Sequence, residues 1–487
     1  MSDATRDSIR DGALARMGLL DETTLLAADN LLARVAASSL ETVRVLFADQ
    51  HGVLRGKTIV ASALASAFTS GIAMASTLLL KDTSHRTAFS VWSGGTGLQS
   101  GPLQGANDVL LVPVPSTFRT LPWSPHSAWI FCDVVYRDGT AIPFSARSVL
   151  GNAIDRLADA GMTATIGLEV EFHVFQRVDA ALSHADTTMP GTPPETRALA
   201  QGYQFLTDSK YGEVEPVLDD LRRAAQGLGL PVRSVEIEMG PSQFEFTFDP
   251  APVMDHADNL MMFRAMVKQV CAAKGLHASF MTKPRLPNVA ACGWHIHQSL
   301  CDLKSGASLM IPDRAGTLTP QASGWIAGLL THAAASSLLT VPTVNGYKRY
   351  QPYQLAPNRI QWGQDNRGAM IRALMAPNDP ASRVENRAPD TTANPYFALA
   401  AQLISGLDGI TSGLTAPPPT QTPYEGEAAL LPTSLAEAID AFDQSTLYRQ
   451  ALGDETVDYL LQIKRFEWNR YLSAISEWEQ AEYFSLF

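Results

Sequence analysis

The fold is decided by the stretch at residues 167–175, which has the sequence GLEVEFHVF. Its β-branched and aromatic residues predict a strand, and side chains alternate between the two faces of a strand. Glu169 and Glu171 therefore point to the same side. Two buried like charges cost much free energy unless cations or protons compensate them. We expect a positively charged ligand beside this pair.

Two further runs repeat the period of two. In residues 243–248 (QFEFTF), phenylalanines alternate with polar residues that include Glu245, which predicts a strand with one apolar face and one polar face. In residues 294–299 (WHIHQS), the two histidines share one face. Several carboxylates with one imidazole suit magnesium or manganese better than zinc, which prefers several nitrogen or thiolate ligands. A lone Glu-x-Glu pair, by contrast, is usually a solvated strand edge.

Length and composition bound the class of protein. The 487 residues carry 37 lysines and arginines against 49 acids, a net charge of −12, so the surface as a whole should not attract nucleic acid or anionic lipid. The four cysteines lack CxxC spacing, which indicates reduced, mostly buried thiols. Without a long apolar run or a signal-peptide pattern, we expect a cytoplasmic enzyme that does not enter a membrane.

Periodicity along the chain predicts an N-terminal segment with one helix before residue 40, then a small β-rich unit, then a larger unit beyond residues 142–145. The predicted strands are 43–49, 108–113, 128–134, 167–175, 277–282 and the two that carry Glu238 and Glu245. The predicted helices are 146–160, 217–228, 256–274, 324–339, 395–407, one capped by Ser434, and a last one from Asp454 with a buried stripe from Val457 to Ile475. We expect loops over 71–106 and a mobile insertion at 180–196.

A basic cluster lies between residues 345 and 390. It contains the arginines Arg349, Arg367, Arg372, Arg383 and Arg387, with Glu385 among them. The guanidinium fork matches carboxylate and phosphate oxygens, so this cluster near a metal site predicts a multiply anionic substrate. Phosphoryl transfer needs this combination of metal ions and guanidinium groups.

From about Val43 to its end the chain resembles the glutamine synthetase superfamily. The motifs that carry the resemblance are the Glu-x-Glu strand, Glu238 and Glu245 around Gly-Pro-Ser-Gln, Gly-Trp-His-x-His-Gln-Ser-Leu, Asn-Gly-Tyr-Lys-Arg, Asp-Asn-Arg and Arg-Val-Glu-Asn-Arg-x-x-Asp. The resemblance implies an α+β fold. A β-grasp domain at 41–142 would follow an N-terminal extension at 1–40, and a catalytic α/β domain at 143–487 would form a half-barrel of antiparallel strands with flanking helices.

The resemblance also implies roles for matching residues, with two or three Mg²⁺ or Mn²⁺ ions per site. The first metal would be held by Glu171, Glu238 and Glu245, and the second by Glu169, His295 and Glu385. The ATP site would include His297, Ser299 and Arg383. Of the arginines, Arg349 and Arg387 would clamp the α-carboxylate of L-glutamate, Arg367 and Arg372 would stabilise the transferred phosphoryl group, and Arg349 counts with these two as catalytic.

The departures from the family pattern concern the ammonium site. Glutamine synthetases carry a flap Gly-Tyr-Glu-Ala-Pro whose acid helps to bind and deprotonate ammonium, and here Leu355 stands where that acid would be. The Asp-Gly-Ser-Ser motif that supplies a second acid has no counterpart between Gly71 and Gly105. An ammonium ion must be desolvated and deprotonated before it attacks, whereas a neutral amine need not be.

We therefore expect a γ-glutamylamide (glutamate–amine) ligase that uses ATP, L-glutamate and an arylamine of the aniline type or a small alkylamine. Leu355, Tyr353 and Tyr203 are the residues expected at the amine pocket. The alternatives are glutamine synthetase itself, a γ-glutamylpolyamine synthetase, and a catalytically inactive structural or sensor homologue. The six intact ligand positions argue against the inactive homologue. The family further implies a homo-oligomer, a dodecamer of two hexameric rings.

Overall fold

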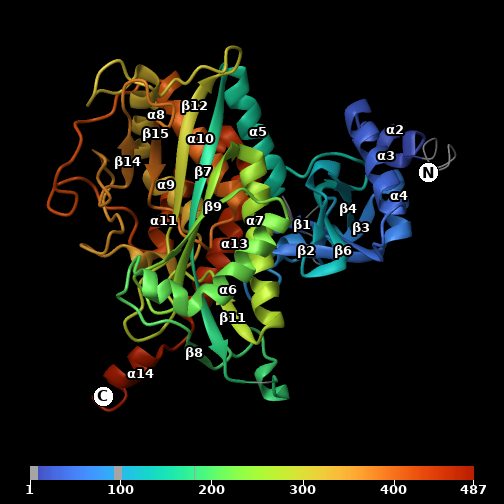
Figure 1. The fold of residues 1–487 in the computed structure, drawn as a ribbon, viewed down its shortest axis with the longest axis horizontal. Coiled ribbons are helices and arrows are strands. Elements are labelled where there is room, and N and C mark those ends of the chain that lie inside the picture. Colours follow the sequence, from blue (N-terminus) through green and yellow to red (C-terminus); the bar gives the residue numbers. More distant parts are fainter. Residues whose placement is uncertain (1–8, 93–100, 180) are drawn as a thin grey trace.

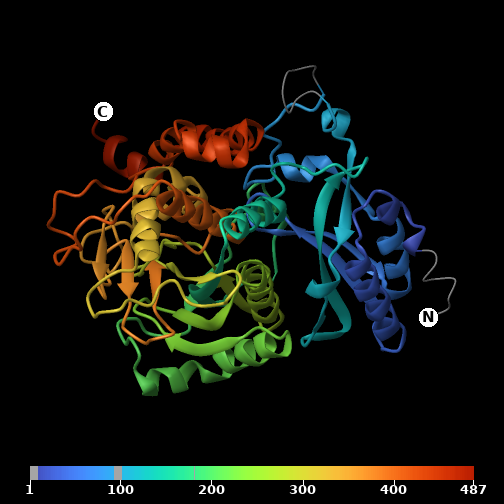
Figure 2. The same ribbon diagram turned by 90° about the horizontal axis from the view of Figure 1, so that it is seen from above.

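The computed structural model describes residues 9–92, 101–179 and 181–487. Residues 1–8, 93–100 and 180, which belong to the expected N-terminal extension, loop stretch and insertion, lie outside the described residues. Two sheets organise the rest. The smaller sheet forms a lobe at one end of the molecule, next to the N-terminus, and the larger sheet occupies the other end with most of the helices (Figures 1 and 2).

The smaller sheet has the strand order β2-β1-β6-β4-β3, with β5 paired to β6. Alternating apolar residues form β1, where Val43, Val45 and Phe47 are buried. The strands are β1 (Thr42–Ala48), β2 (Leu54–Val60), β3 (Ile72–Ala75), β4 (Asp108–Pro113), β5 (Arg119–Leu121) and β6 (Ser124–Tyr136). Beside it lie α2 (Ala13–Arg16), α3 (Glu22–Ala36) and α4 (Leu64–Ser70). The short strand β3 falls within the stretch expected to be loops.

The larger sheet is built around β7 (Met162–Arg177), the strand that contains the opening stretch. Its order is β13-β14-β15-β12-β7-β10-β9, with β8 and β11 also paired to β7. The pairs are antiparallel except β13 with β14, which is parallel. The other strands are β8 (Thr196–Ala198), β9 (Val232–Ile237), β10 (Gln243–Pro252), β11 (Leu276–Ser279), β12 (Trp294–Asp302), β13 (Trp362–Gln364), β14 (Ile371–Leu374) and β15 (Arg383–Asn386).

One face of β7 and β10 is apolar and packs against α7 (Val253–Ala273). Phe263 of α7 lies 5.7 Å from Phe172 and 5.1 Å from Phe246, measured between ring centroids. Each buried phenylalanine contributes about 1.5–3 kcal/mol. Because this face is covered by a helix, the acids on the alternate positions face the other side of the sheet.

The remaining helices surround the larger sheet (Figure 1). They are α5 (Ala146–Asp159), α6 (Asp208–Gly227), α8 (Pro320–Thr331), α9 (Ala333–Thr340), α10 (Pro395–Thr411), α11 (Leu435–Asp443), α12 (Thr446–Leu452), α13 (Asp454–Leu472) and α14 (Glu477–Tyr483). As predicted, Asn394 caps α10, since its side chain accepts a hydrogen bond from the amide of Tyr396. None of the described helices is long and apolar enough to cross a membrane.

Three helix predictions were wrong in detail. Helix α6 begins at Asp208 rather than 217, with Pro216 inside it, because burial of its apolar side outweighs the one amide bond that proline removes. The helix expected over 324–339 is two helices that break at His332, whose ring lies 2.8 Å from Asp408 of α10. The buried stripe of α13 stops short of Tyr471, Leu472 and Ile475, which are exposed.

The turn after β1 attaches the smaller sheet to the helices of the larger one. Arg264 of α7 donates a hydrogen bond of 2.9 Å to the carbonyl of Gly52, and the Asn394 amide donates one of 2.9 Å to the carbonyl of Asp49. Gly52 has φ +67°, and a Cβ there would lie 2.6 Å from the Arg264 guanidinium. This turn therefore needs glycine both for its backbone and for the close approach of Arg264.

Candidate functional site

Strand register brings the predicted metal ligands side by side. Glu245 of β10 is paired with Glu171 of β7, and His295 of β12 is paired with Glu169 of β7. Glu385 of β15 is paired with His297 of β12. Directly opposed residues on neighbouring strands project to the same face about 5 Å apart, so the pairing produces one row of acids and imidazoles.

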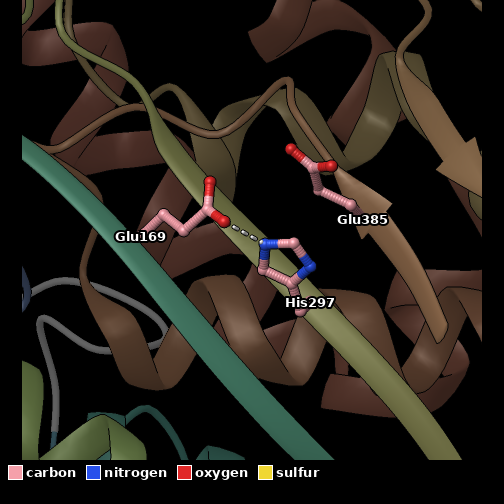
Figure 3. A group of neighbouring side chains, drawn as sticks. All are labelled: Glu169, His297 and Glu385. Carbon is pink, nitrogen blue, oxygen red and sulfur yellow. Dashed lines mark hydrogen bonds and ion pairs between the residues drawn. The ribbon is translucent and has the colours of Figure 1, made fainter. Parts of the chain in front are cut away.

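The row contains three groups whose ligand atoms all lie within 4.8 Å of one another. They are Glu171 with Glu238 and Glu245, Glu169 with Glu245 and His295, and Glu169 with His297 and Glu385. Figure 3 shows the last group, with its three residues on β7, β12 and β15 and a hydrogen bond between Glu169 and His297. All six predicted ligand positions are thus brought together, and His297, predicted for the ATP site, stands among them.

At one end of the row the carboxylates are not neutralised by protein cations. No lysine or arginine among the described residues forms an ion pair with Glu171, Glu238 or Glu245. Burial and the neighbouring Glu171 raise the pKa of Glu238 to about 8, and the same two causes raise the pKa of Glu245 well above its usual value. This end of the row therefore demands protons or bound cations.

At the other end, imidazoles and arginines surround Glu169 and Glu385. Burial opposes ionisation of Glu169, but hydrogen bonds from His295 at 3.1 Å and His297 at 2.8 Å lower its pKa. The Nδ1 atom of His297 accepts a hydrogen bond of 2.9 Å from Arg383, so its Nε2 carries the proton that Glu169 accepts. To act as a metal ligand, His297 would have to release that proton.

The donor set fits hard divalent cations. Carboxylate oxygens dominate the row, imidazoles are few, and no thiol belongs to the three groups in the described chain. This composition suits Mg²⁺ or Mn²⁺. The fit is best at Glu171, Glu238 and Glu245, where a cation would relieve the repulsion that raises the pKa values of Glu238 and Glu245.

Arg372, predicted to be catalytic, and Arg387, predicted to bind glutamate, both contact the row. Arg372 donates a hydrogen bond of 3.0 Å to Glu385 and forms a second ion pair with Asp365. Arg387 also pairs with Glu385. Burial opposes ionisation of Glu385, but Arg387, His295 and His297 lower its pKa. Arg349 is buried and donates to the backbone carbonyls of residues 387–389, so it braces the segment that carries Arg387. The side chain of Arg367 is exposed.

The remaining predicted ATP residues lie on β12 and β15. The hydroxyl of Ser299 donates a hydrogen bond of 3.1 Å to the carbonyl of Ser382, the residue before Arg383. Arg383 donates one hydrogen bond from Nε to His297 and another from a terminal nitrogen to the carbonyl of Ala381. Their roles toward nucleotide stay predictions.

The predicted amine-pocket residues are exposed and flank the row. The carbonyl of Leu355 accepts a 3.4 Å hydrogen bond from Arg387, and the ring of Tyr353 lies 5.0 Å from that of Tyr424. Tyr203 lies elsewhere, where its amide donates to the carbonyl of Met239, the residue after Glu238. Leu355 and Tyr353 are therefore neighbours in the structure, and Tyr203 borders the carboxylate end.

Three residues that contact the site residues were not predicted from the sequence. Gln243 donates a hydrogen bond of 2.9 Å to Glu171. Its place on the polar face of β10 could have indicated a contact with the row of acids. Asp365 pairs with Arg372, and Tyr424 packs on Tyr353 from a distant loop. No local sequence signal links residue 424 to residue 353, because only the tertiary fold brings them together.

Comparisons with known proteins agree with this site. The family model described as "Glutamine synthetase, catalytic domain" matches residues 143–483. A γ-glutamylanilide synthase of an Acinetobacter species is 37% identical over 94% of this chain and 96% of that protein. A γ-glutamylethanolamide synthetase, GlnA4, of Streptomyces coelicolor is 32% identical over 96% of this chain and 98% of that protein. Proteins described as glutamine synthetase also match, at 31–34% identity.

Solved structures share the fold. The chain aligns with a structure described as apo GmaS without ligand at a TM-score of 0.78 and 28% identity, over 93% of this chain and 99% of that one. The expected α+β architecture is therefore confirmed.

Proposed function

The chain belongs to the glutamine synthetase family of ligases, and from this premise we propose that it joins the γ-carboxyl of L-glutamate to an organic primary amine at the expense of ATP. The observation that carries the proposal is an intact row of six metal-ligand positions beside a flap in which Leu355 replaces the acid expected of an ammonia-using enzyme.

The cations are proposed to be Mg²⁺ or Mn²⁺, two or three per site. Glu171, Glu238 and Glu245, which form one of the three groups, would hold one ion. Glu169, His295 and Glu385 would hold a second, since Nδ1 of His295 lies 3.1 Å from Glu169 and 3.7 Å from Glu385. When bound, such ions polarise phosphate oxygens and neutralise charge that develops during phosphoryl transfer. His297, Ser299 and Arg383 are proposed to contact the nucleotide, since they lie together where β12 meets β15.

The chemistry takes two displacements. An oxygen of the glutamate γ-carboxylate attacks the γ-phosphorus of ATP, the bond to the bridging oxygen breaks, and ADP leaves. The amine nitrogen then attacks the acyl carbon of γ-glutamyl phosphate, phosphate departs, and the nitrogen loses a proton to give the γ-glutamylamide. Arg372 and Arg367 would stabilise the transferred phosphoryl group, while Arg387 and Arg349 would position the α-carboxylate.

The acceptor is proposed to be neutral and at least partly apolar, with an arylamine such as aniline favoured over a small alkylamine. Leu355 and Tyr353 offer an apolar and aromatic rim beside Arg387, and Tyr424 extends it. An aromatic ring gains from edge or offset contacts with tyrosine, whereas ammonium finds no carboxylate on Leu355. The similarity to a γ-glutamylanilide synthase supports this choice.

Glutamine synthetase activity is the alternative, favoured by the relatives that carry that name. In that case another acid, such as Glu238 beside Tyr203, would have to replace the missing flap acid. We also propose a cytoplasmic, homo-oligomeric enzyme, a dodecamer of two rings. The four cysteines are free thiols, as a reducing compartment permits.

Phosphate release tests the proposal. The full chain is incubated with ATP, L-glutamate and Mg²⁺, and with one acceptor at a time: aniline, isopropylamine, ethanolamine, putrescine or ammonium. We expect the highest kcat/KM with aniline. Release that depends strictly on ammonium would overturn the proposal, and no release with any acceptor would favour an inactive homologue.

A further inference from the structure

A cavity of about 650 Å³ separates the turn after β1 from α7 and β11, away from the carboxylate row. Its lining comes from both sheets, with Arg44 from β1 and Trp129 from β6 on one side and Lys268 from α7 and Phe280 on the other. This volume is within the range of small-molecule sites. None of the residues that line the row of acids takes part in it.

The lining is strongly cationic. Its charged or imidazole side chains include Arg44, Arg55, Arg264, Lys268, His277 and Lys464, and no aspartate or glutamate belongs to the described lining. Two of these cations are neutralised from outside the cavity, Arg55 by Asp49 at 2.9 Å and Lys464 by Glu467 at 3.1 Å.

Three cations form no ion pair with a carboxylate in the described part of the chain, although Asp390 and Asp49 act on Arg264 from a greater distance. Arg44 donates only to the neutral amide of Gln269, at 2.8 Å. Arg264 is buried and donates to backbone carbonyls and to the sulfur of Met261. Lys268, one helical turn after Arg264, has neither a hydrogen bond nor an ion pair within residues 9–92, 101–179 and 181–487. Like charges four residues apart on a helix repel each other.

We propose that this cavity is a binding site for a small organic anion that carries at least two carboxylate or phosphate groups. Arg44 of β1 and Lys268 of α7 line it from different elements and have no ion-paired carboxylate among the described residues, so each can bind a separate anionic group, while Trp129 and Phe280 supply an apolar wall for the body of the molecule. Burial and the nearby Arg264 lower the pKa of Lys268, and an anion would reverse that effect.

Position suggests what such a ligand does. The cavity is also lined by Thr391 and Asn394, in the segment that follows Arg387, and by the turn at residues 50–55 of the smaller sheet. An anion that bridges Arg44 and Lys268 would tie the smaller sheet to α7 and to the segment that leads from the carboxylate row. Binding to the folded chain should therefore stabilise it against unfolding.

The test compares Lys268→Gln with Lys274→Gln in the full chain. Lys274 caps the same helix and pairs with Asp220 outside the cavity, so its substitution matches the lost charge without touching the lining. Isothermal titration calorimetry with citrate and with pyrophosphate distinguishes the carboxylate and phosphate sources. For at least one of them we expect an affinity about tenfold weaker in Lys268→Gln, roughly 1.4 kcal/mol, and unchanged in Lys274→Gln.

Crystals soaked in selenate locate the anion. We expect an anomalous peak within hydrogen-bond distance of Lys268 Nζ, in addition to any peak at the arginines of the carboxylate row. Equal affinities in the two variants, or selenate at the row but not in the cavity, would overturn the proposal. Neither result bears on amine ligation, because Lys268 lies outside the proposed reaction site.

Discussion

Single carboxylates at the metal end of the row work against the stability of the metal-free chain. Glu171, Glu238 and Glu245 lie together without an ion-paired lysine or arginine among the described residues. Glu245→Gln replaces a carboxyl whose ionisation burial and the neighbouring acids oppose, so we expect the metal-free melting temperature to rise by about 1 °C for each kcal/mol relieved in a chain of 487 residues. Added Mg²⁺ should stabilise the variant much less than the native chain, and phosphate release should fall at least about 100-fold.

Calorimetric melting with EDTA and then with Mg²⁺ measures both effects. The matched control is Glu215→Gln, which removes an exposed acid of α6 far from the row. A metal-free Glu245→Gln protein that melts well below the native chain would mean that Glu245 is held by protein contacts rather than by a cation.

Leu355 sets the acceptor in the proposed reaction. Leu355→Glu restores the acid that ammonia-using relatives are expected to carry, so kcat/KM for ammonium should rise about tenfold and that for aniline should fall by a similar factor. Leu355→Ala should weaken use of aniline without improving that of ammonium. Initial rates of phosphate release decide the matter, and an unchanged ratio of the two acceptors would remove Leu355 from the acceptor pocket.

At this scale the sequence predicted which acids and histidines share one face of the sheet. Period-two alternation puts Glu169, Glu171 and His295 on one face of their strands, and the strand register then brings them together. The contacts of Arg349 could not be predicted from sequence, because its partners are backbone carbonyls, which a pattern of side chains does not reveal. The tautomer of His297 depends on Arg383, 86 residues away, and needs the fold to be known.

Among the helices, α8 and α10 cross at glycines. A Cβ on Gly409 would lie 2.0 Å from the carbonyl oxygen of Gly324 and 2.5 Å from the backbone nitrogen of Gly328. Gly409→Ala should therefore force the helices apart and cost about 1–3 kcal/mol. In α5, Gly151 has open space around its Cβ position, so Gly151→Ala should stabilise by about 0.5–1 kcal/mol. Urea unfolding measures both, and equal effects would contradict the close crossing.

A buried histidine of α7 makes stability depend on pH. The Nε2 of His256 bonds the carbonyl of Asp249, and burial lowers the pKa of the imidazole to about 4. Between pH 6.5 and 4 the unfolded chain therefore binds a proton that the folded chain does not, so stability falls as the pH falls. The free energy of unfolding should fall by about 3 kcal/mol over this pH interval.

His256→Gln keeps a donor for the Asp249 carbonyl but does not titrate. The difference in unfolding free energy between native and variant proteins should narrow or change sign as the pH falls from 7 to 4. Denaturant unfolding at several pH values measures it. A constant difference across this range would show that His256 takes up its proton in the folded chain as readily as in the unfolded chain.

Elements with a clean period were predictable, and those that depend on distant contacts were not. The alternation in β7, β10 and β12 and the cap of α10 follow from local sequence. The start of α6 does not follow from local sequence. Pro216 predicts a helix boundary, but the helix continues through it because its apolar side is buried in the fold. The break between α8 and α9 coincides with the contact of His332 with α10, which lies outside any local window.

For the whole molecule, we propose that the C-terminal segment takes part in the expected homo-oligomer. Helix α14 projects from the larger sheet, and the apolar residues around it are exposed, Phe487 at 98% and Ile475 at 81% (Figure 1). An exposed apolar surface of this kind marks contacts with other chains. Deleting residues 474–487 should lower the mass seen by sedimentation velocity, whereas an unchanged large assembly would place the contacts elsewhere.

The central claim is that cations gathered by the carboxylate row activate a γ-carboxyl beside an acceptor pocket too apolar for ammonium. The most direct measurement is a competition in one reaction that contains ATP, L-glutamate, Mg²⁺ and equal concentrations of aniline and ammonium, with products quantified by mass spectrometry. We predict that γ-glutamylanilide forms in excess and that EDTA abolishes it. Glutamine as the main product would contradict the account.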